Sequence, residues 1–208
     1  EVTNAREEGL PVWAETCPHF LIFTDERLAR EDGYKWLGSP PLRDEATQAA
    51  LWEGLGDGRI SVAATDDCAF SLASKVAGAE NFELCPEGMP GIEPRLNILY
   101  SEGVAKGRIT LPQLVDQTST APAKLFGFAP KKGNLAPGAD ADIVLLDPSV
   151  RWTMSQDTLH MASDYTSYEG VEVTGKVAKV FSRGELIVDG EDFLAAPGRG
   201  RFVPCKLD

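Results

Sequence analysis

The sequence has few histidines, little positive charge and no closely paired cysteines. It contains two histidines and 20 lysines and arginines against 32 aspartates and glutamates, which gives a formal net charge of −12 at pH 7. Phosphate groups and anionic membranes bind clustered Lys and Arg, so this balance argues against nucleic acid or a membrane as partner. No apolar run approaches the roughly 20 residues of a membrane helix. The polar, acidic residues 1–8 do not resemble a secretory signal peptide.

The four cysteines lie far apart in the sequence, at Cys17, Cys68, Cys85 and Cys205. Without a C-x-x-C pair, they fit neither a disulfide framework nor a zinc ribbon. We therefore expect reduced thiols and a cytoplasmic protein.

The 208 residues have an ordinary globular composition, with 43% hydrophobic and 25% charged residues. Helix signals occur at 2–8, 45–55 (capped by Asp44), 95–105, 111–115 (with a Thr110/Gln113 capping box) and 123–126. Strand signals occur at 12–14, 60–65, 143–146, 177–181 and 185–188, the last two as a hairpin. The pattern predicts an α/β part, residues 1–130, a mainly β part, residues 131–190, and a terminal segment, residues 191–208.

The strand at 60–65 is small and apolar throughout, which is typical of a parallel strand covered on both faces. Such a strand needs neighbours, and a closed (β/α)8 barrel takes about 250 residues. Residues 1–130 can therefore form only part of a barrel, and we expect the chain to be a piece of a larger unit.

Asp66 and Asp67 follow this strand at its carboxyl end, where α/β barrels build their active sites. A carboxylate buried there needs a cation or hydrogen-bond donors. One interpretation is a metal ligand that also transfers a proton, and the other is a turn or helix cap. The two remain open on position alone. His19 and His160 each lack a paired ligand nearby and are expected to be hydrogen-bonded core residues.

Seven motifs occur in an order that is more informative than any one of them. They are ETCPHFL (15–21), SPPLR (39–43), TDDCAF (65–70), GIEPR (91–95), AKLFG (123–127), GADADIV (138–144) and DYTSYEG (164–170). Together they resemble the C-terminal half of the hydantoinase/dihydropyrimidinase branch of the cyclic amidohydrolases, over essentially the whole chain.

The resemblance implies the C-terminal part of a metal-dependent (β/α)8 barrel plus part of a small β-sandwich. It implies two metal ions, usually zinc, with a bridging hydroxide that attacks the cyclic amide of a hydantoin or dihydropyrimidine. Asp66 matches a metal ligand that takes a proton from the hydroxide and passes it to the leaving nitrogen. Ser39 and Glu87 match positions whose backbone contacts the substrate ring, although many family members have Asn in place of Glu87.

The family's H-x-H pair, its carboxylated lysine and its two later histidines are not among these residues, and His19 and His160 do not match them. One carboxylate cannot hold two metal ions, so we expect this chain to be inactive without the missing N-terminal half. The alternative is a non-catalytic dihydropyrimidinase-like scaffold, because such relatives share the Pro-Glu-Gly at 86–88. Residues 197–204, with Phe202 and Val203, resemble an arm that packs on a neighbouring subunit of a homotetramer.

Overall fold

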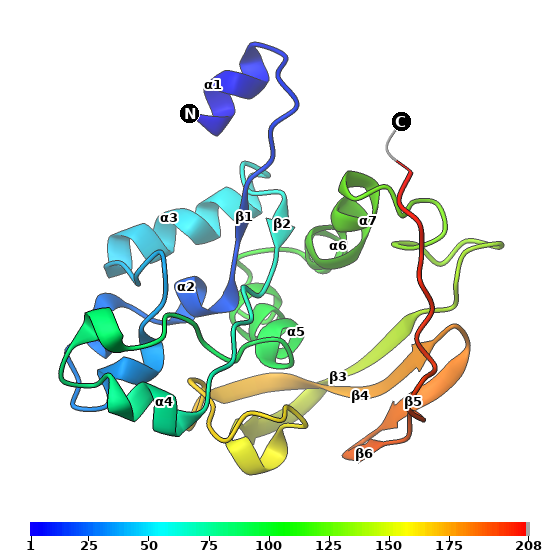
Figure 1. Cartoon of the computed structure of the whole chain (residues 1–208). Helices are drawn as coiled ribbons and strands as arrows, with labels where there is room; N and C mark the ends of the chain where they lie inside the picture. The colour runs from blue at the N-terminus through cyan, green and yellow to red at the C-terminus, as the bar shows by residue number, and fades with distance from the viewer. Residues whose placement is uncertain (207–208) are drawn as a thin grey trace.

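The chain folds into a helical part around a short parallel sheet and a second part built on a long antiparallel sheet (Figure 1). The computed structural model describes residues 1–206. The barrel expected from the resemblance is not closed by this chain. The first sheet has only two strands, β1 (Glu15–Thr16) and β2 (Val62–Ala63).

Seven α-helices are spread through residues 1–206, and most are short. They are α1 (Val2–Glu7), α2 (Pro18–Ile22), α3 (Glu45–Gly56), α4 (Leu72–Ala77), α5 (Pro94–Ile98), α6 (Leu111–Val115) and α7 (Ala121–Leu125). A π-helical turn, Leu99–Val104, continues α5, and another, Asp116–Thr120, joins α6 to α7. Short 3₁₀ turns lie at Asp25–Arg27, Gly33–Trp36, Phe82–Leu84 and Gln156–Thr158. None of the helices in this described range is long and apolar enough to cross a membrane.

The parallel pairing of β1 with β2 starts later than the sequence signals predict. Glu15 lies opposite Val62 and Thr16 opposite Ala63. The strand expected at 12–14 is wrong by a few residues, and Trp13 is 55% exposed. The first hydrogen bonds between the two segments are made by Ala14, whose carbonyl accepts the N–H groups of Ser61 and Val62. The residues before Ala14 therefore lie outside the strand.

The second sheet contains four antiparallel strands in the order β3-β4-β5-β6. The strands are β3 (Ile143–Thr153), β4 (Glu172–Ser182), β5 (Glu185–Asp189) and β6 (Asp192–Phe193). The expected hairpin joins β4 to β5 through Arg183 and Gly184, at φ 52° and 79°. Both residues are left-handed, as a tight two-residue hairpin turn requires.

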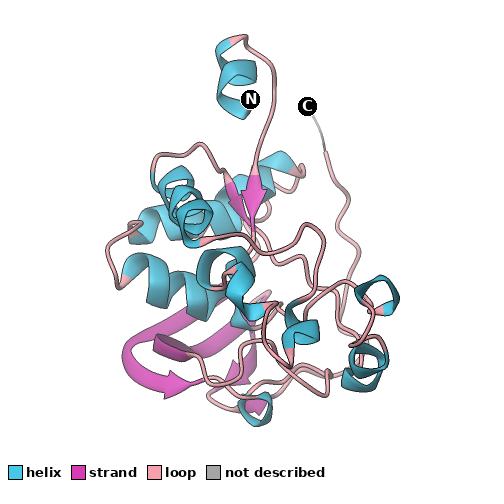
Figure 2. Cartoon of the chain, turned by 90° about the vertical axis from the view of Figure 1, so that its left-hand side faces the viewer, coloured by secondary structure: helices cyan, strands magenta, loops and turns pink. Residues whose placement is uncertain are grey.

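Two clusters of buried side chains hold the layers together. One packs α3 and α6 against β2, with Trp52, Leu55 and Leu114 among its members. The other joins the loops after β1 and β2 to the antiparallel sheet through Phe23, Met89 and further residues. Helix α5 packs on β4, and Figure 2 shows helices above the long strands.

Helix α1 projects from the main body at the N-terminal end (Figure 1). Arg6 of α1 donates to the carbonyls of Val12 and Gly58 and to the Ser61 hydroxyl. Near the other end, Lys206 donates its N–H to the Gly127 carbonyl, while Phe202 is 91% exposed. The last two residues of the predicted segment 191–208 lie outside the described residues.

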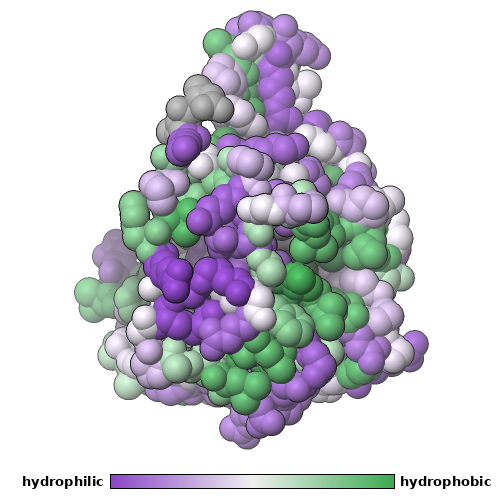
Figure 3. Space-filling model, turned by 90° about the vertical axis from the view of Figure 1, so that its right-hand side faces the viewer, coloured by the Kyte–Doolittle hydropathy of each residue, from purple (hydrophilic) through white to green (hydrophobic). Residues whose placement is uncertain are grey.

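The face on the right of Figure 1 carries a broad hydrophobic area beside a hydrophilic one (Figure 3). Large apolar side chains exposed between residues 126 and 202 are Phe126, Leu135, Val144, Leu145, Phe193, Leu194 and Phe202. Exposed apolar patches of this kind are typical of surfaces that another chain or segment covers.

Candidate functional site

Asp66 lies just beyond the carboxyl end of β2. Val62 and Ala63 are buried, whereas the side chain of Asp66 is exposed. Its backbone has φ 49°, in the left-handed region that non-glycine residues seldom adopt. The chain therefore turns sharply at this aspartate.

Cys17 and His19 follow β1, the parallel neighbour of β2. The charge of Asp66 affects the pKa of both side chains. Burial raises the pKa of the Cys17 thiol to about 12, and the Asp66 carboxylate adds to this rise. Burial lowers the pKa of His19 to about 4, and Asp66 partly opposes that change. His19 is 2% exposed, and its ring centre lies 4.1 Å from that of Phe20, with the two rings tilted by 58°. His19 is therefore a buried core residue, which confirms that part of the prediction, while no hydrogen bond of its ring is seen among the described residues.

Asp67 has a different environment from Asp66. Its Oδ1 accepts the backbone N–H groups of Gly91 at 2.7 Å and Ile92 at 3.1 Å. Asp67 also forms an isolated parallel β-bridge with Met89, a buried residue of the second core cluster. The Asp67 side chain thus holds the backbone of a distant loop, a role that neither interpretation of the aspartate pair named.

The segments that contain Ser39 and Glu87 lie side by side. Gly88 donates its N–H to the Leu37 carbonyl at 2.9 Å. Ser39 and Glu87 themselves are exposed. The structure thus brings together the two segments that the sequence singled out for backbone contacts.

The same loop also packs closely on the segment that follows Asp66. Gly88 has φ 146°, and a Cβ added there would lie 2.6 Å from the Cys68 carbonyl oxygen. Cys68 donates its N–H to the Met89 carbonyl at 3.2 Å. Glycine is required at position 88 for this approach. As a result, the segments of Ser39, Asp66 and Glu87 form one group of loops.

Sequence reasoning missed Lys75, which lies beneath these loops. Its side chain is completely buried, and its ammonium group donates to the carbonyls of Leu37 and Pro86. Lys75 is on α4, a helix that was not predicted. Ser71 caps this helix through the Ser74 N–H, and a serine before an apolar pair is the signal that was available.

A cavity of about 560 Å³ lies beside the loops. Asp67, Phe70, Pro90, Ile92 and Asp164 are among its lining residues. The cavity has apolar walls and two acidic residues, Asp67 and Asp164, in its lining, and it lies next to the turn at Asp66 and Asp67.

The residues present do not by themselves fit a metal centre. Within residues 1–206, no group of three or more His, Cys, Asp or Glu side chains is placed to share an ion. A catalytic zinc site uses three protein ligands, and the carboxylates of these loops are not grouped closely enough to supply them within residues 1–206. We therefore derive no chemical step through a metal from this chain alone.

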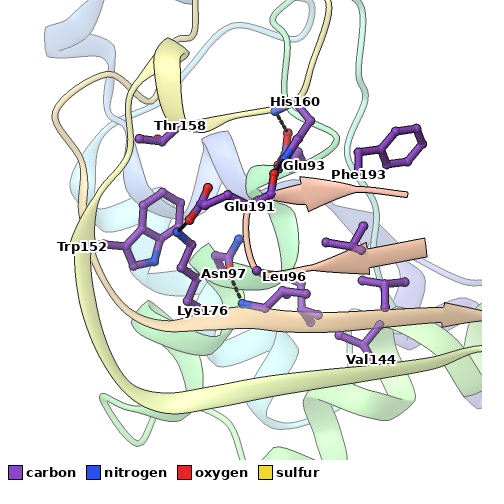
Figure 4. A pocket seen from close by; sticks show the side chains of 14 residues that line it. Glu93, Leu96, Asn97, Val144, Trp152, Thr158, His160, Lys176, Glu191 and Phe193 are labelled. Carbon is purple, nitrogen blue, oxygen red and sulfur yellow. Dashed lines mark hydrogen bonds and ion pairs between the residues drawn. The ribbon is translucent and has the colours of Figure 1, made fainter. Parts of the chain in front are cut away.

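His160 is not a core residue, which corrects the prediction made from its sequence context. It is exposed at a second cavity of about 330 Å³ between α5 and the antiparallel sheet (Figure 4). Its Nδ1 lies 2.7 Å from Glu93 Oε1 and its Nε2 lies 2.9 Å from the Glu191 carbonyl oxygen. Glu191 also pairs with Lys176, whose ammonium lies 4.8 Å from the centre of the Trp152 ring. His160 thus connects the two parts of the fold.

Comparison with known proteins agrees with this architecture. The model of the amidohydrolase family matches residues 27–187. The D-hydantoinase of Geobacillus stearothermophilus is 46% identical over 206 residues, which is 98% of this chain and 44% of that protein. The solved D-hydantoinase of Bacillus sp. AR9 superimposes with a TM-score of 0.96 at 43% identity, over 100% of this chain and 46% of that one. The dihydropyrimidinase of Brevibacillus agri gives a TM-score of 0.94 at 45% identity, over 97% of this chain and 44% of that one.

The chain belongs to the amidohydrolase family, and within it to the D-hydantoinase/dihydropyrimidinase branch. It spans 44% of the length of the G. stearothermophilus relative. The comparison therefore assigns the chain to this branch of the family, and the activity of the complete protein remains a proposal.

Proposed function

We propose that the chain is the C-terminal part of a metal-dependent (β/α)8 amidohydrolase barrel with part of a small β-sandwich. Residues 1–130 would form the barrel portion, residues 131–190 the sandwich portion and residues 191–208 a C-terminal arm. The parallel pairing of β1 with β2 and the separate antiparallel sheet support this division.

The complete protein then hydrolyses the cyclic amide bond of a hydantoin or a dihydropyrimidine. The observation that carries this proposal is the meeting of the segments of Ser39, Asp66 and Glu87 in one group of loops. In this assignment the main chain at Ser39 and Glu87 binds the polar edge of the ring. Asp66 holds a proton at its carboxylate for transfer to the leaving nitrogen, for which its exposed, outward position is suited.

Two zinc ions are the proposed cofactor, with other divalent metals as alternatives. An aspartate oxygen is an acceptable zinc ligand, so Asp66 would contribute one ligand. The remaining ligands would come from residues outside these 208, since the described part of the chain lacks a set of three.

The proposed partners are the missing N-terminal half, further copies of the protein in a homotetramer, and a small cyclic ureide as substrate. The exposed apolar side chains between residues 126 and 202 support a covered surface in the assembly. Phe202, at 91% exposed, is suited to anchor the arm on a neighbour.

The test compares Asp66→Asn with Asp67→Asn in the complete protein. Loss of a proton-transferring group typically costs about 10² to 10⁴-fold in rate, so kcat for hydantoin and dihydrouracil should fall in this range for Asp66→Asn. Asp67→Asn keeps an oxygen that can accept the Gly91 and Ile92 N–H groups. Its kcat should stay within a few-fold of wild type.

The scaffold alternative predicts a different result in the same assay. A correctly assembled complete protein that binds no metal and shows no hydrolase activity after incubation with zinc would contradict the enzyme proposal and favour the scaffold. Equal losses in both aspartate variants would contradict the special role of Asp66.

A further inference from the structure

Lys75 is a charged side chain with 0% exposure, held by backbone oxygens. Its Nζ donates to the Leu37 carbonyl at 3.0 Å and to the Pro86 carbonyl at 2.6 Å. The Phe70 ring lies on another side, with its centre 6.0 Å from Nζ. An ammonium has three donors, so most of its hydrogen-bonding capacity is directed at two fixed points of the main chain.

Burying this ammonium costs free energy unless its donors are satisfied. Burial lowers the pKa of Lys75, and the neighbouring Cys85, Cys68 and Glu87 oppose that change. The cost is offset mainly by the two carbonyl oxygens. The Lys75 ammonium can remain buried only while both carbonyl oxygens stay within hydrogen-bonding distance. The same two hydrogen bonds restrict the movement of the carbonyl groups.

The two carbonyls belong to the two loops proposed to bind substrate. Leu37 lies two residues before Ser39, and Pro86 lies directly before Glu87. The Leu37 carbonyl accepts from both Lys75 and the Gly88 N–H. The Lys75 ammonium therefore bridges the loop of Ser39 and the loop of Glu87.

Helix α4 fixes Lys75 itself from two directions. The Ser71 side chain accepts the Ser74 N–H at 3.2 Å, and Asp164 Oδ1 accepts the Leu72 N–H at 2.8 Å. The lysine is thus mounted on a helix that is anchored at its first turn.

We infer that Lys75 is a positioning residue for the substrate, because its ammonium sets the spacing between the backbone at Ser39 and the backbone at Glu87. The inference rests on the proposed function of these loops. Lys75 does not touch the substrate, since it is fully buried behind them. Its loss should weaken substrate binding more than it slows bond cleavage.

The experiment compares Lys75→Met and Lys75→Arg in the complete, metal-loaded protein. In Lys75→Met, KM for hydantoin or dihydrouracil should rise at least about tenfold, while kcat changes less than about threefold. Lys75→Arg, which keeps the charge and the donors, should recover most of the lost affinity. Lys106→Met removes an exposed lysine paired with Glu102 and should match wild type.

Hydrogen exchange followed by mass spectrometry gives a readout that does not depend on activity. The peptide that contains Gly88 should exchange at least about tenfold faster in Lys75→Met, with peptides of β4 unchanged. If Lys75→Met does not fold, Lys75→Arg must still protect the Gly88 N–H as wild type does, and loss of that protection contradicts the inference.

The outcomes separate the inference from the proposal on which it rests. An active wild type whose Lys75→Met variant keeps its KM within twofold overturns the role of Lys75 alone. A folded variant in which kcat and KM change together with general loss of protection also overturns it, because that pattern marks a merely structural lysine. An inactive wild type contradicts the proposed function, and the substrate role of Lys75 fails with it.

Discussion

His160 is held between two groups that only accept hydrogen bonds. The Glu191 carbonyl raises the pKa of His160 above its ordinary value of 6.5, and the Glu93 side chain raises it further. A neutral imidazole has one N–H, so only the doubly protonated ring can donate to both partners. The contact between α5 and the β5–β6 turn is therefore strongest when His160 is charged.

This arrangement predicts a loss of stability as the pH rises above neutrality. A group whose pKa is raised in the folded state stabilises fully below its ordinary value of 6.5, and that contribution disappears as the pH rises through the folded value. We expect the difference in free energy of unfolding between wild type and His160→Gln to shrink from pH 6 to pH 9. Denaturant titrations of the complete protein at both pH values measure it.

The neutral His19 provides the internal control for this measurement. Its pKa is lowered to about 4, so its protonation affects stability only below its ordinary value of 6.5. His19 is present in both wild type and His160→Gln, so its contribution at pH 6 cancels in the difference between them. A wild-type-to-variant difference that is constant across the range would show that the His160 contacts do not depend on charge.

Individual residues were predictable where their role depends on nearby sequence. Asp66 and Asp67 could be placed at the end of a strand because the apolar run before them is readable. That Asp67 would accept the Gly91 and Ile92 N–H groups could not be predicted, because those donors are 24 and 25 residues away. Lys75 was missed for the same reason, since its acceptor at Leu37 is 38 residues away.

Helix starts are the elements that the sequence predicts best, because caps are local. Asp44 accepts the Thr47 N–H at 2.9 Å, as expected for the helix that it begins. At α6, Thr110 and Gln113 form the predicted capping box, and Gln113 Nε2 also donates to the Gly56 carbonyl at 2.6 Å. The box thus ties the start of α6 to the end of α3.

Removal of the Thr110 hydroxyl tests how much the capping box stabilises the start of α6. Thr110→Ala should lower the free energy of unfolding by about 1 kcal/mol, the usual cost of losing an N-cap hydroxyl. Thr110→Ser retains the hydroxyl and should stay close to wild type. Denaturant unfolding of the three proteins gives the comparison, and equal stability of the alanine and serine variants would show that the hydroxyl contributes nothing here.

Strand lengths were predicted poorly, because they depend on the partner strand. The signal for β3 covered only residues 143–146, since Asp147 and Pro148 are typical turn residues. In the structure β3 continues to Thr153, with a register shift after Asp147, whose carboxylate accepts the Ser149 N–H at 2.8 Å. Pro148 is accommodated in that irregularity, as prolines in sheets usually are.

For the whole molecule, the sequence indicated correctly that these residues form only part of an amidohydrolase barrel. β2 is buried but pairs only with β1 within the described residues, and the chain spans 44% of the length of its hydantoinase relative. Composition and motif order were enough for the family because the motifs extend along the full chain. The exposure of Asp66 could not be predicted from its place after a buried strand, because Val62 and Ala63 are buried and Asp66 is not.

We propose that this chain provides one metal-binding carboxylate and two backbone contacts to a site that another half completes. Native mass spectrometry of the chain, alone and co-expressed with the N-terminal half, tests it most directly. We expect two metal ions for each pair of halves, none on the chain alone, and a lower metal content of the pair in Asp66→Asn. Two ions on the isolated chain, or a stable pair without any metal, would contradict it.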